Sequence, residues 1–419
     1  MSVSDSSLSR RDVLRAAGAL GAAAVMGGAA LGQVRPGLPG ATPTSAPGEA
    51  ASQPVQVPTR VFGRSGVKVS ILALGGIFDI LNNQVALHQA LRHGVTYWDT
   101  ANGYNGGNSE LGIGNFLGEN PQRRKDLFLV TKSGNHDAAG LDEHLALSLE
   151  RMKTDHVEMF FIHNLKGARE IQQHGAEWKQ WAQRQRDAGK IKLFGFSAHT
   201  RQEEAMLEAA KTDYIDGIML TYNFRVMGKP RMKEAIAACH DAGIGLTAMK
   251  TMALRTNREP TTQPQEKALV DQLVAKGCSP EQGCLKVVWE NPAIASICTL
   301  MPNLAILQAD VQAATDGIAL SAGDRRLMQE YAQATCGGYC AACGTCQDLA
   351  GGLPVPDVMR WLMYARSYGE LARARQEFAQ LPSAVRGALA GADFSAAQRR
   401  CPQGMPIAQL IRSACEELA

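Results

Sequence analysis

Short apolar runs alternate with longer amphipathic segments over most of the chain, and this alternation restricts the fold more than any other feature of the sequence. The runs span 69–74, 96–100, 127–131, 157–162, 192–196, 217–221, 245–249 and 295–300. The segments between them carry apolar residues at helical spacing, as in 141–152, 201–210 and 233–242. Several of these segments end at a glycine just before the next run, as expected for a helix C-cap; the examples are Gly94, Gly189 and Gly243.

Eight strand–helix units within about 250 residues predict an α/β fold of the closed (β/α)8 type, a TIM barrel. A doubly wound open sheet is the alternative, but no G-x-G-x-x-G pattern follows the first run. We expect the barrel to occupy residues 59–320. A small, mainly helical extension is expected at 321–419.

Composition and charge narrow the class of protein. Of the 419 residues 45% are hydrophobic and 20% are charged, which suits a soluble globular protein with a large core. The net charge is only +3 and no block of like charge occurs, so nothing in the composition indicates nucleic-acid binding.

The N-terminus has the organisation of an export signal. Arg10 and Arg11 precede an uncharged run of mostly Ala and Gly at 16–34, and the arginine pair resembles the twin-arginine export signal. We therefore interpret 1–34 as a signal peptide, read by the twin-arginine export machinery, of an exported, periplasmic protein. A membrane-spanning helix or tether is the alternative, but so many Gly and Ala residues make a poor span. Residues 35–58, rich in Pro, Ala, Ser and Thr, are predicted to be a disordered linker.

Four polar residues lie at or just after the ends of neighbouring runs. Asp99, Lys132 and His163 come at the ends of the second, third and fourth runs, and Tyr104 follows in the loop after the second. The C-terminal ends of barrel strands form one rim, so these side chains are expected to meet there. Each alone has a structural explanation, such as a buried ion pair or a core histidine. Four converging residues favour an active site.

The four groups suit carbonyl reduction. Tyrosine has a pKa of about 10, and a neighbouring ammonium lowers it. Asp99 would hold Lys132 beside Tyr104, which would protonate the developing alkoxide. His163 would donate a hydrogen bond to the substrate carbonyl. None of these groups carries hydride, so a cofactor must supply it.

These motifs resemble the signature of the aldo-keto reductase family. They are Asp-Thr-Ala-x-x-Tyr at 99–104, Asn-Ser-Glu at 108–110, Val-Thr-Lys at 130–132 and Phe-Ile-His at 161–163. The resemblance covers about residues 60–314 and includes 60–70, 195–197 and 222–223. It implies a TIM barrel, an NAD or NADP cofactor, and Asp99, Tyr104, Lys132 and His163 as the catalytic tetrad. It also implies that Ser197 and Asn223 lie near the nicotinamide.

One segment departs from the family pattern. After the eighth strand, family members usually carry Gly and Ser or Thr with Lys or Arg, which hold the cofactor phosphates. Here no Lys or Arg occurs between Lys286 and Arg325. A 2′-phosphate is best held by a fixed cation, so the sequence leaves the choice between NADP and NAD open. Lys250, with Arg255 and Arg258, is the candidate substitute after the seventh strand.

A cysteine group follows the barrel. Cys-x2-Cys-x2-Cys with a distant Cys-Pro resembles the ligand pattern of a bacterial ferredoxin, and of a branch of aldo-keto reductases with ferredoxin-like tails. Ala350 stands where a ferredoxin run would place its fourth cysteine, so Cys401 is expected to replace it, with Cys336 as the alternative. Zinc and disulfides are the other interpretations. The expected ligands of a 4Fe–4S cluster are Cys340, Cys343, Cys346 and Cys401.

Two functions follow from these patterns. The first is an exported oxidoreductase that acts on a small carbonyl or alcohol substrate. Its 4Fe–4S centre would serve structure, or electron transfer to a partner. Export of an already folded protein is consistent with a cluster assembled before export. The second is a catalytically silent barrel that serves as a binding or scaffold module with a structural metal site. The aromatic residues Trp361, Tyr364 and Tyr368 are expected to be core rather than an electron path.

Overall fold

The computed structural model describes residues 54–254 and 264–419. The chain from Pro54 to Ala419 forms one compact unit. The predicted signal peptide and all but the last five residues of the predicted linker lie outside the described residues, so both stay predictions. Within the described ranges, no helix combines the length and the apolar character that crossing a membrane requires.

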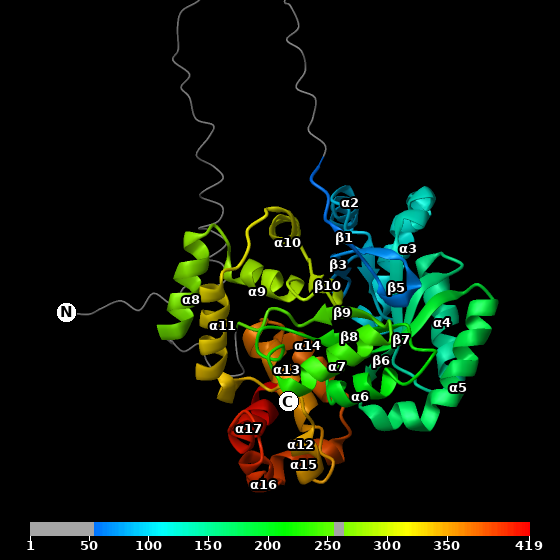
Figure 1. The fold of residues 1–419 in the computed structure, drawn as a ribbon. Coiled ribbons are helices and arrows are strands. Elements are labelled where there is room, and N and C mark those ends of the chain that lie inside the picture. The colour runs from blue at the N-terminus through cyan, green and yellow to red at the C-terminus, as the bar shows by residue number, and fades with distance from the viewer. Residues whose placement is uncertain (1–53, 255–263) are drawn as a thin grey trace, which may run out of the picture. The chain divides into compact units, whose positions relative to one another are not determined.

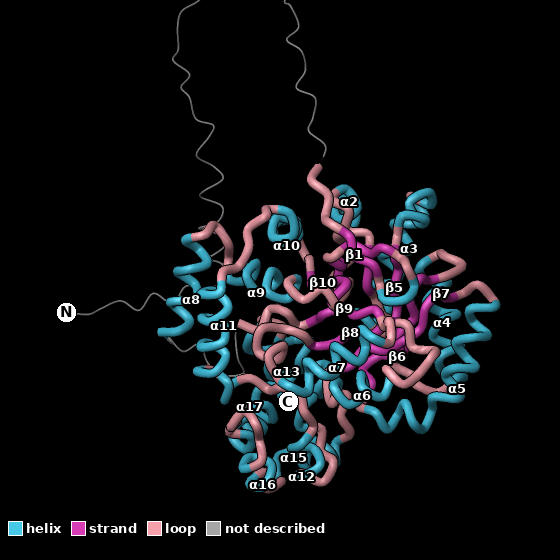
Figure 2. The backbone as a smooth tube through the Cα atoms, in the orientation of Figure 1, coloured by secondary structure: helices cyan, strands magenta, loops and turns pink. Residues whose placement is uncertain are grey.

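Eight parallel strands close into a barrel, which confirms the predicted fold (Figure 2). The first strand pairs with the last, Ala73 opposite Cys298, so the sheet has no free edge. The barrel strands are β3 (Leu72–Gly75), β4 (Tyr97–Asp99), β5 (Phe128–Ser133), β6 (Val157–Leu165), β7 (Ile191–Ala198), β8 (Gly217–Thr221), β9 (Gly245–Met249) and β10 (Ile294–Leu300).

The first predicted strand, 69–74, is wrong as one element. Its first half is β2 (Lys68–Ser70), which pairs antiparallel with β1 (Thr59–Val61) outside the barrel. Its second half is the barrel strand β3. The chain changes partner at Ser70, whose hydroxyl donates to Leu72 O at 2.7 Å and accepts from the Tyr97 amide at 3.2 Å. An apolar run alone does not show this change because both halves are buried.

Helices follow the barrel strands and cover them. They are α2 (Gln84–Arg92), α3 (Asn108–Glu119), α4 (Ala138–Met152), α5 (Ala168–Asp187), α6 (Gln202–Ala209), α7 (Pro230–Asp241), α8 (Pro264–Ala275), α9 (Pro280–Trp289) and α10 (Leu304–Thr315). Short 3-10 helices are η1 (Gly63–Ser65), η2 (Tyr104–Gly107) and η3 (Pro121–Asp126). Gly94, Gly189 and Gly243 follow their helices with φ of 73°, 70° and 70°. This left-handed backbone confirms the predicted C-caps.

The elements after the barrel belong to two different cores. The first is α11 (Ala322–Ala334), whose Met328 and Tyr331 are part of the barrel core, as is Tyr339 after η4 (Cys336–Gly338). A separate apolar core joins the later helices. These are α12 (Thr345–Leu349), α13 (Val355–Ser367), α14 (Leu371–Ala379), α15 (Ser383–Gly391), α16 (Ser395–Arg399) and α17 (Ile407–Leu418). The packing thus changes after Tyr339, later than the expected boundary at 320/321. We call residues 340–419 the extension.

The extension docks on the C-terminal end of the barrel (Figure 1). The Arg201 amide, after β7, donates to Ala342 O at 3.0 Å, and Lys166, after β6, pairs with Asp357 at 3.1 Å. Trp361 and Tyr364 are buried in the core of the extension, and Tyr368 packs against it. The core role expected for these aromatic residues is confirmed. The extension therefore covers the barrel end at which the tetrad lies.

Candidate active site

The structure brings the four expected residues together at one rim. Asp99 is the last residue of β4, Tyr104 begins η2, and Lys132 and His163 lie near the ends of β5 and β6. The parallel register sets Lys132 opposite Phe161, two residues before His163. The rings of Tyr104 and His163 meet edge to face at 5.6 Å between their centroids.

The loop that carries Tyr104 is shaped by glycine and by buried polar bonds. Gly107 has φ of 95°, and a Cβ there would lie 2.6 Å from the Arg151 guanidinium. Glycine suits this positive φ, and its lack of a side chain leaves room for Arg151, which donates to Asn102 O at 3.0 Å and to Glu110 at 3.2 Å. Glu110 also accepts from the Thr131 hydroxyl at 2.6 Å. The Glu of the Asn-Ser-Glu motif thus fixes the loop against β5.

Lys132 is the buried centre of the site. Its ammonium lies 2.6 Å from each Asp99 oxygen and donates to Thr100 O at 2.7 Å and to the Tyr104 hydroxyl at 3.3 Å. Burial opposes its charge, but Asp99, Tyr104 and Cys298 together outweigh burial, and the pKa of Lys132 rises above its usual value. Lys132 therefore stays charged and links the carboxylate to the phenol.

The expected direction of the Tyr104 pKa shift is wrong. Burial raises the pKa of the Tyr104 phenol to about 12, although the Lys132 ammonium pulls it down. Desolvation disfavours the phenolate more strongly than one shared cation favours it, because Asp99 already neutralises that cation. Tyr104 is therefore a protonated phenol at neutral pH, the form that a proton donor needs.

His163 is held as a neutral imidazole. Burial, followed by the positive charges of Lys132 and Arg360, holds the pKa of His163 well below 6.5. Its backbone oxygen contacts His136 Nε2 at 3.0 Å, and His136 Nδ1 contacts Glu170 at 2.6 Å. A neutral imidazole can donate one hydrogen bond to a carbonyl without adding charge. This agrees with the role expected for His163.

The residues predicted to bind the cofactor lie at the same rim. The Ser197 hydroxyl accepts from the Asn164 amide at 3.0 Å. Asn223 is fully buried, and its amide nitrogen donates to Lys250 O and to the Tyr339 hydroxyl, both at 2.9 Å. Nothing in these contacts tests binding of a nucleotide. The cofactor roles of Ser197, Asn223 and Lys250 stay predictions.

The segment after β10 has no phosphate clamp of the usual kind. Asn303 caps α10 with its own side chain, which accepts from the Ile306 amide at 3.0 Å. The nearby Asp310 is buried, accepts from the Thr299 hydroxyl at 2.8 Å, and has its pKa raised to about 7 by burial. Arg255 and Arg258, the candidate substitutes beside Lys250, lie outside the described residues.

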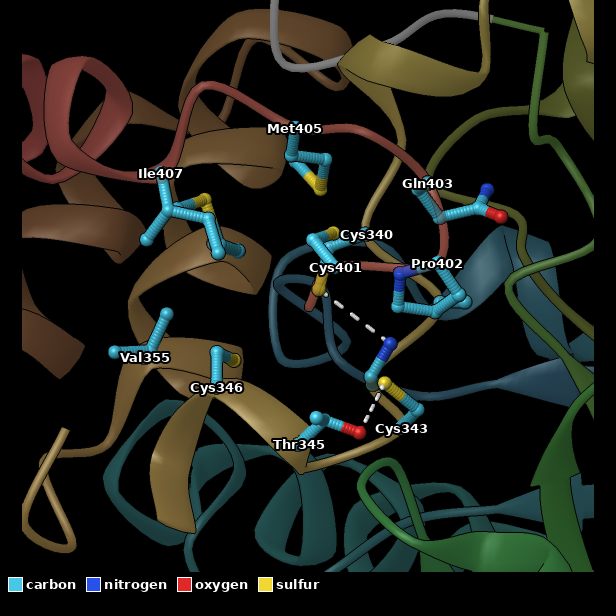
Figure 3. Close-up of a pocket in the computed structure, with 13 residues that line it drawn as sticks. Cys340, Cys343, Thr345, Cys346, Val355, Cys401, Pro402, Gln403, Met405 and Ile407 are labelled. Atoms are coloured by element: carbon cyan, nitrogen blue, oxygen red, sulfur yellow. Dashed lines mark hydrogen bonds between the residues drawn. The ribbon is translucent and has the colours of Figure 1, made fainter. Parts of the chain in front are cut away.

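Four cysteines line one pocket of the extension (Figure 3). Cys340, Cys343, Cys346 and Cys401 surround it together with apolar residues such as Val355 and Met405. Cys336 is not among the lining residues, so the pocket favours Cys401 as the fourth thiol. The pKa of the Cys340 thiol rises to about 12, mainly because the thiol is buried. The Ala342 amide lowers this pKa, and the neighbouring thiols Cys346, Cys343 and Cys401 raise it further.

The four thiols of this pocket are suitable metal ligands, but in this structure they are not arranged around a common point as bound ligands would be. All ten cysteines lie in the described ranges, and each is a free thiol. Within those ranges, no group of three or more His, Cys, Asp or Glu side chains is placed to hold a metal ion. Four thiols in one apolar pocket fit a cluster in number and chemistry. The assignment of a cluster stays a prediction.

Several polar groups at the rim carry no sequence motif. His199, after β7, is partly buried, and desolvation followed by the charge of Arg360 holds its pKa well below 6.5. Arg360 of α13 and Arg373 of α14 also act on the tetrad through their charges. No spacing rule predicts that helices more than 190 residues after His163 reach the same rim. Only the docking of the extension brings them there.

Comparison with known proteins agrees with this geometry. The model of the aldo/keto reductase family matches residues 80–305, more than half of the chain. The chain therefore belongs to the aldo/keto reductase family. Homologues of this chain are named as an oxidoreductase and as an aldo-keto reductase.

Individual relatives are distant. An uncharacterised oxidoreductase of Bacillus subtilis, YrpG, is 28% identical over 220 residues, which are 46% of this chain and 65% of that protein. The aldo-keto reductase yakc of Schizosaccharomyces pombe, whose name includes NADP(+), is 28% identical. The matched region covers 34% of this chain and 46% of the yakc chain. The chain thus spans less than two thirds of these two curated relatives. The holo form of an aldo-keto reductase from Bacillus halodurans shares the fold, with a TM-score of 0.56, 22% identity, and coverage of 66% of this chain and 96% of that one.

Proposed function

We propose that this protein transfers hydride between a nicotinamide cofactor and a small carbonyl or alcohol substrate, with Tyr104 as the general acid and base. The observation that carries the proposal is the contact of the Tyr104 hydroxyl with the buried Lys132–Asp99 pair at 3.3 Å. A protonated phenol, a fixed ammonium and a neutral imidazole at one rim form a proton-donating site. Family membership supports the same chemistry.

Each residue has one role in carbonyl reduction. His163 donates a hydrogen bond to the carbonyl oxygen and orients it. As negative charge develops on that oxygen, Tyr104 donates its proton, and the adjacent Lys132 ammonium stabilises the phenolate that remains. Asp99 keeps Lys132 in place. When bound, a nicotinamide supplies the hydride; Ser197 and Asn223 are the residues that would hold its ring end, and Lys250 would face its phosphates.

A 4Fe–4S cluster in the pocket of Cys340, Cys343, Cys346 and Cys401 is the second part of the proposal. What supports it is the donor set, four thiols lining one pocket, together with the ferredoxin-like spacing. Such a cluster would stabilise the extension or pass electrons to a partner. Export by the twin-arginine pathway belongs to the same proposal and rests on the N-terminal residues alone.

The experiment that tests the catalytic proposal is an anaerobic titration of the full-length protein with NADPH and NADH, followed by tryptophan fluorescence. Saturable binding of one nucleotide, with consumption of that nucleotide when an aldehyde is added, would support the proposal. A folded, nucleotide-free protein that binds neither would instead favour the scaffold function, in which the tetrad is structural.

A further inference from the structure

The strand that carries His163 is irregular at that residue. The register between β6 and β7 shifts between Ile162 and Leu165, where three steps along β6 match two along β7. Asn164 has φ of 65°, a left-handed backbone that asparagine adopts more readily than most residues. A bulge of this kind redirects a side chain. The direction in which the His163 imidazole projects therefore depends on how the bulge is held.

Side chains from outside β6 contact both polar ends of the peptide that joins His163 to Asn164. The His163 carbonyl oxygen lies 3.0 Å from Nε2 of His136, which is in the loop between β5 and α4. The Asn164 amide donates to Ser197 Oγ of β7 at 3.0 Å. Because β5 and β7 are the two neighbours of β6, this peptide is fixed from both sides.

The His136 ring lies between two hydrogen-bond acceptors. Its Nδ1 is 2.6 Å from Glu170 Oε2, and its Nε2 faces the His163 carbonyl, which can only accept, so Nε2 bears a hydrogen. The other Glu170 oxygen accepts from the Lys166 amide at 2.7 Å, as expected of a carboxylate, so Nδ1 also bears a hydrogen. A neutral imidazole has only one N–H. These contacts therefore require the imidazolium form of His136.

The charges around His136 agree with this form. Burial lowers the pKa of His136, and so does the charge of Lys166, but the bonds to Glu170 and to the His163 carbonyl, with the Glu170 charge, raise it by more. The pKa of Glu170 is below its usual value, because the bonds from His136 and from the Lys166 amide outweigh burial. Asp137, next in the chain, is exposed and caps α4 instead.

The backbone of His136 is anchored as well as its ring. The His136 carbonyl accepts from Trp178 Nε1 at 2.6 Å, and Trp178 is fully buried. The preceding Asn135 amide donates to Ser133 Oγ at 3.0 Å. Since α5 supplies both Trp178 and Glu170, one helix holds both parts of His136. An anchored donor of this kind can set the position of the peptide that it contacts.

We propose that His136, held as an imidazolium by Glu170, is a positioning residue that sets the place of the His163 imidazole through the His163 carbonyl. The inference deepens the proposed function and rests on the role of His163 in it. His136 acts on the backbone from which that imidazole projects. A charged donor suits this task, because charge-assisted hydrogen bonds are shorter and stronger than neutral ones.

NMR of the full-length protein with nitrogen-15-labelled histidine tests the geometry without turnover. At neutral pH His136, assigned by the loss of its signals in His136→Gln, should have hydrogens on both ring nitrogens. The ring signals of His163, assigned through His163→Ala, should shift in His136→Gln. His156→Gln is the matched control and should leave them unchanged. His156 also lies between two acceptors, Asp155 at 2.6 Å and Glu158 at 3.1 Å, but just before the other end of β6.

Kinetics supply a second measurement. In His136→Gln, kcat for aldehyde reduction should fall by about 10²-fold, the cost of a misplacement of about 1 Å, while the affinity for NADPH or NADH stays unchanged. Glu170→Gln should remove one ring hydrogen from His136 at neutral pH. It should lower kcat by a smaller factor, because a neutral imidazole can still donate to the carbonyl. This variant decides the matter if His136→Gln unfolds.

Each outcome supports or overturns the positioning role. A neutral His136 in the wild type, or His163 signals that do not move in His136→Gln, would overturn it. So would a His136 that keeps both hydrogens in Glu170→Gln, or an unaltered kcat in an active His136→Gln. Equal loss of kcat and of nucleotide affinity would also overturn it, because the damage would then be general. The expected NMR result in a protein that transfers no hydride would count against the proposed function alone.

Discussion

The Lys132 ammonium lies 3.3 Å from the Tyr104 hydroxyl while both of its contacts to Asp99 are 2.6 Å. The cation is therefore bound tightly to the carboxylate and more loosely to the phenol. This asymmetry leaves Tyr104 protonated at rest and keeps a positive charge beside it for the moment at which the proton leaves. In the proposed mechanism this buried ion pair would also stabilise the phenolate that remains after proton transfer.

Lys132→Met should strongly destabilise the protein. The variant leaves the Asp99 carboxylate buried without its partner, which costs about 3–5 kcal/mol in comparable buried pairs. The double variant Asp99→Asn/Lys132→Met removes both charges and should recover part of the loss. Thermal unfolding at neutral pH measures both effects. A Lys132→Met protein as stable as the wild type would show that the pair is not buried as described.

Activity should show no ionisation step near pH 6.5. His163 stays neutral because its pKa lies well below that value, and Tyr104 stays protonated because burial raises its pKa to about 12. We expect kcat/KM for aldehyde reduction to be flat between about pH 6 and pH 8. A sigmoidal step in that interval, lost in His163→Ala, would contradict a neutral imidazole.

Stability should fall at high pH for the same reason. The folded pKa of Tyr104 lies above its unfolded value of 10.0, so its contribution is complete below pH 10 and is lost as the pH rises towards 12. Tyr104→Phe cannot ionise and should show a smaller alkaline loss of unfolding free energy. Identical alkaline profiles for the two proteins would mean that the phenol is less buried than described.

The sequence predicts the barrel and the tetrad well because both depend on local patterns. Apolar runs and C-cap glycines such as Gly94 mark the strands, and strand ends place Asp99, Lys132 and His163. It fails where the result depends on partners distant in sequence. Ser70 divides an apolar run between two sheets, and desolvation reverses the shift expected for Tyr104.

Residues of the extension are missed for a related reason. Arg360 and Arg373 belong to an ordinary amphipathic pattern, and nothing in their spacing indicates that their charges contribute to the lowered pKa of His163. Their position follows from contacts that join the barrel loops to the extension, such as Lys166 with Asp357. Cys340, Cys343 and Cys346 are the opposite case, because their close spacing alone indicates a shared pocket, whereas the distant Cys401 is assigned from the resemblance to ferredoxins.

Cys346→Ser should abolish a cluster that Cys336→Ser leaves intact. Cys346 lines the pocket with the three other expected ligands, whereas Cys336 does not. Analysis of iron, acid-labile sulfide and zinc, with visible absorbance, in anaerobically prepared protein measures the difference. Iron and sulfide in the wild type and in Cys336→Ser only would support the cluster. Zinc without sulfide, or equal loss in both variants, would contradict it.

Gly344→Ala should loosen the docked extension more than Gly351→Ala. Both glycines have left-handed backbone, with φ of 82° and 64°, so both variants bear the cost of about 1–2 kcal/mol for a side chain there. At Gly344 the new Cβ would also lie 2.5 Å from Arg201 Nε, whereas nothing lies within 4 Å at Gly351. Thermal unfolding and limited proteolysis compare them. Equal stability would show that Arg201 does not fix the cysteine loop.

The central claim is that Tyr104 delivers a proton as hydride reaches the carbonyl carbon, and transfer of deuterium tests it most directly. Wild-type protein and Tyr104→Phe are incubated with NADPH or NADH that carries two deuterium atoms at C4, together with 4-carboxybenzaldehyde, and the alcohol is analysed by mass spectrometry. The account predicts one deuterium in the wild-type product and a rate about 10²–10⁴ lower in Tyr104→Phe, with nucleotide binding unchanged. An alcohol without deuterium, or an unaltered rate in Tyr104→Phe, would contradict it.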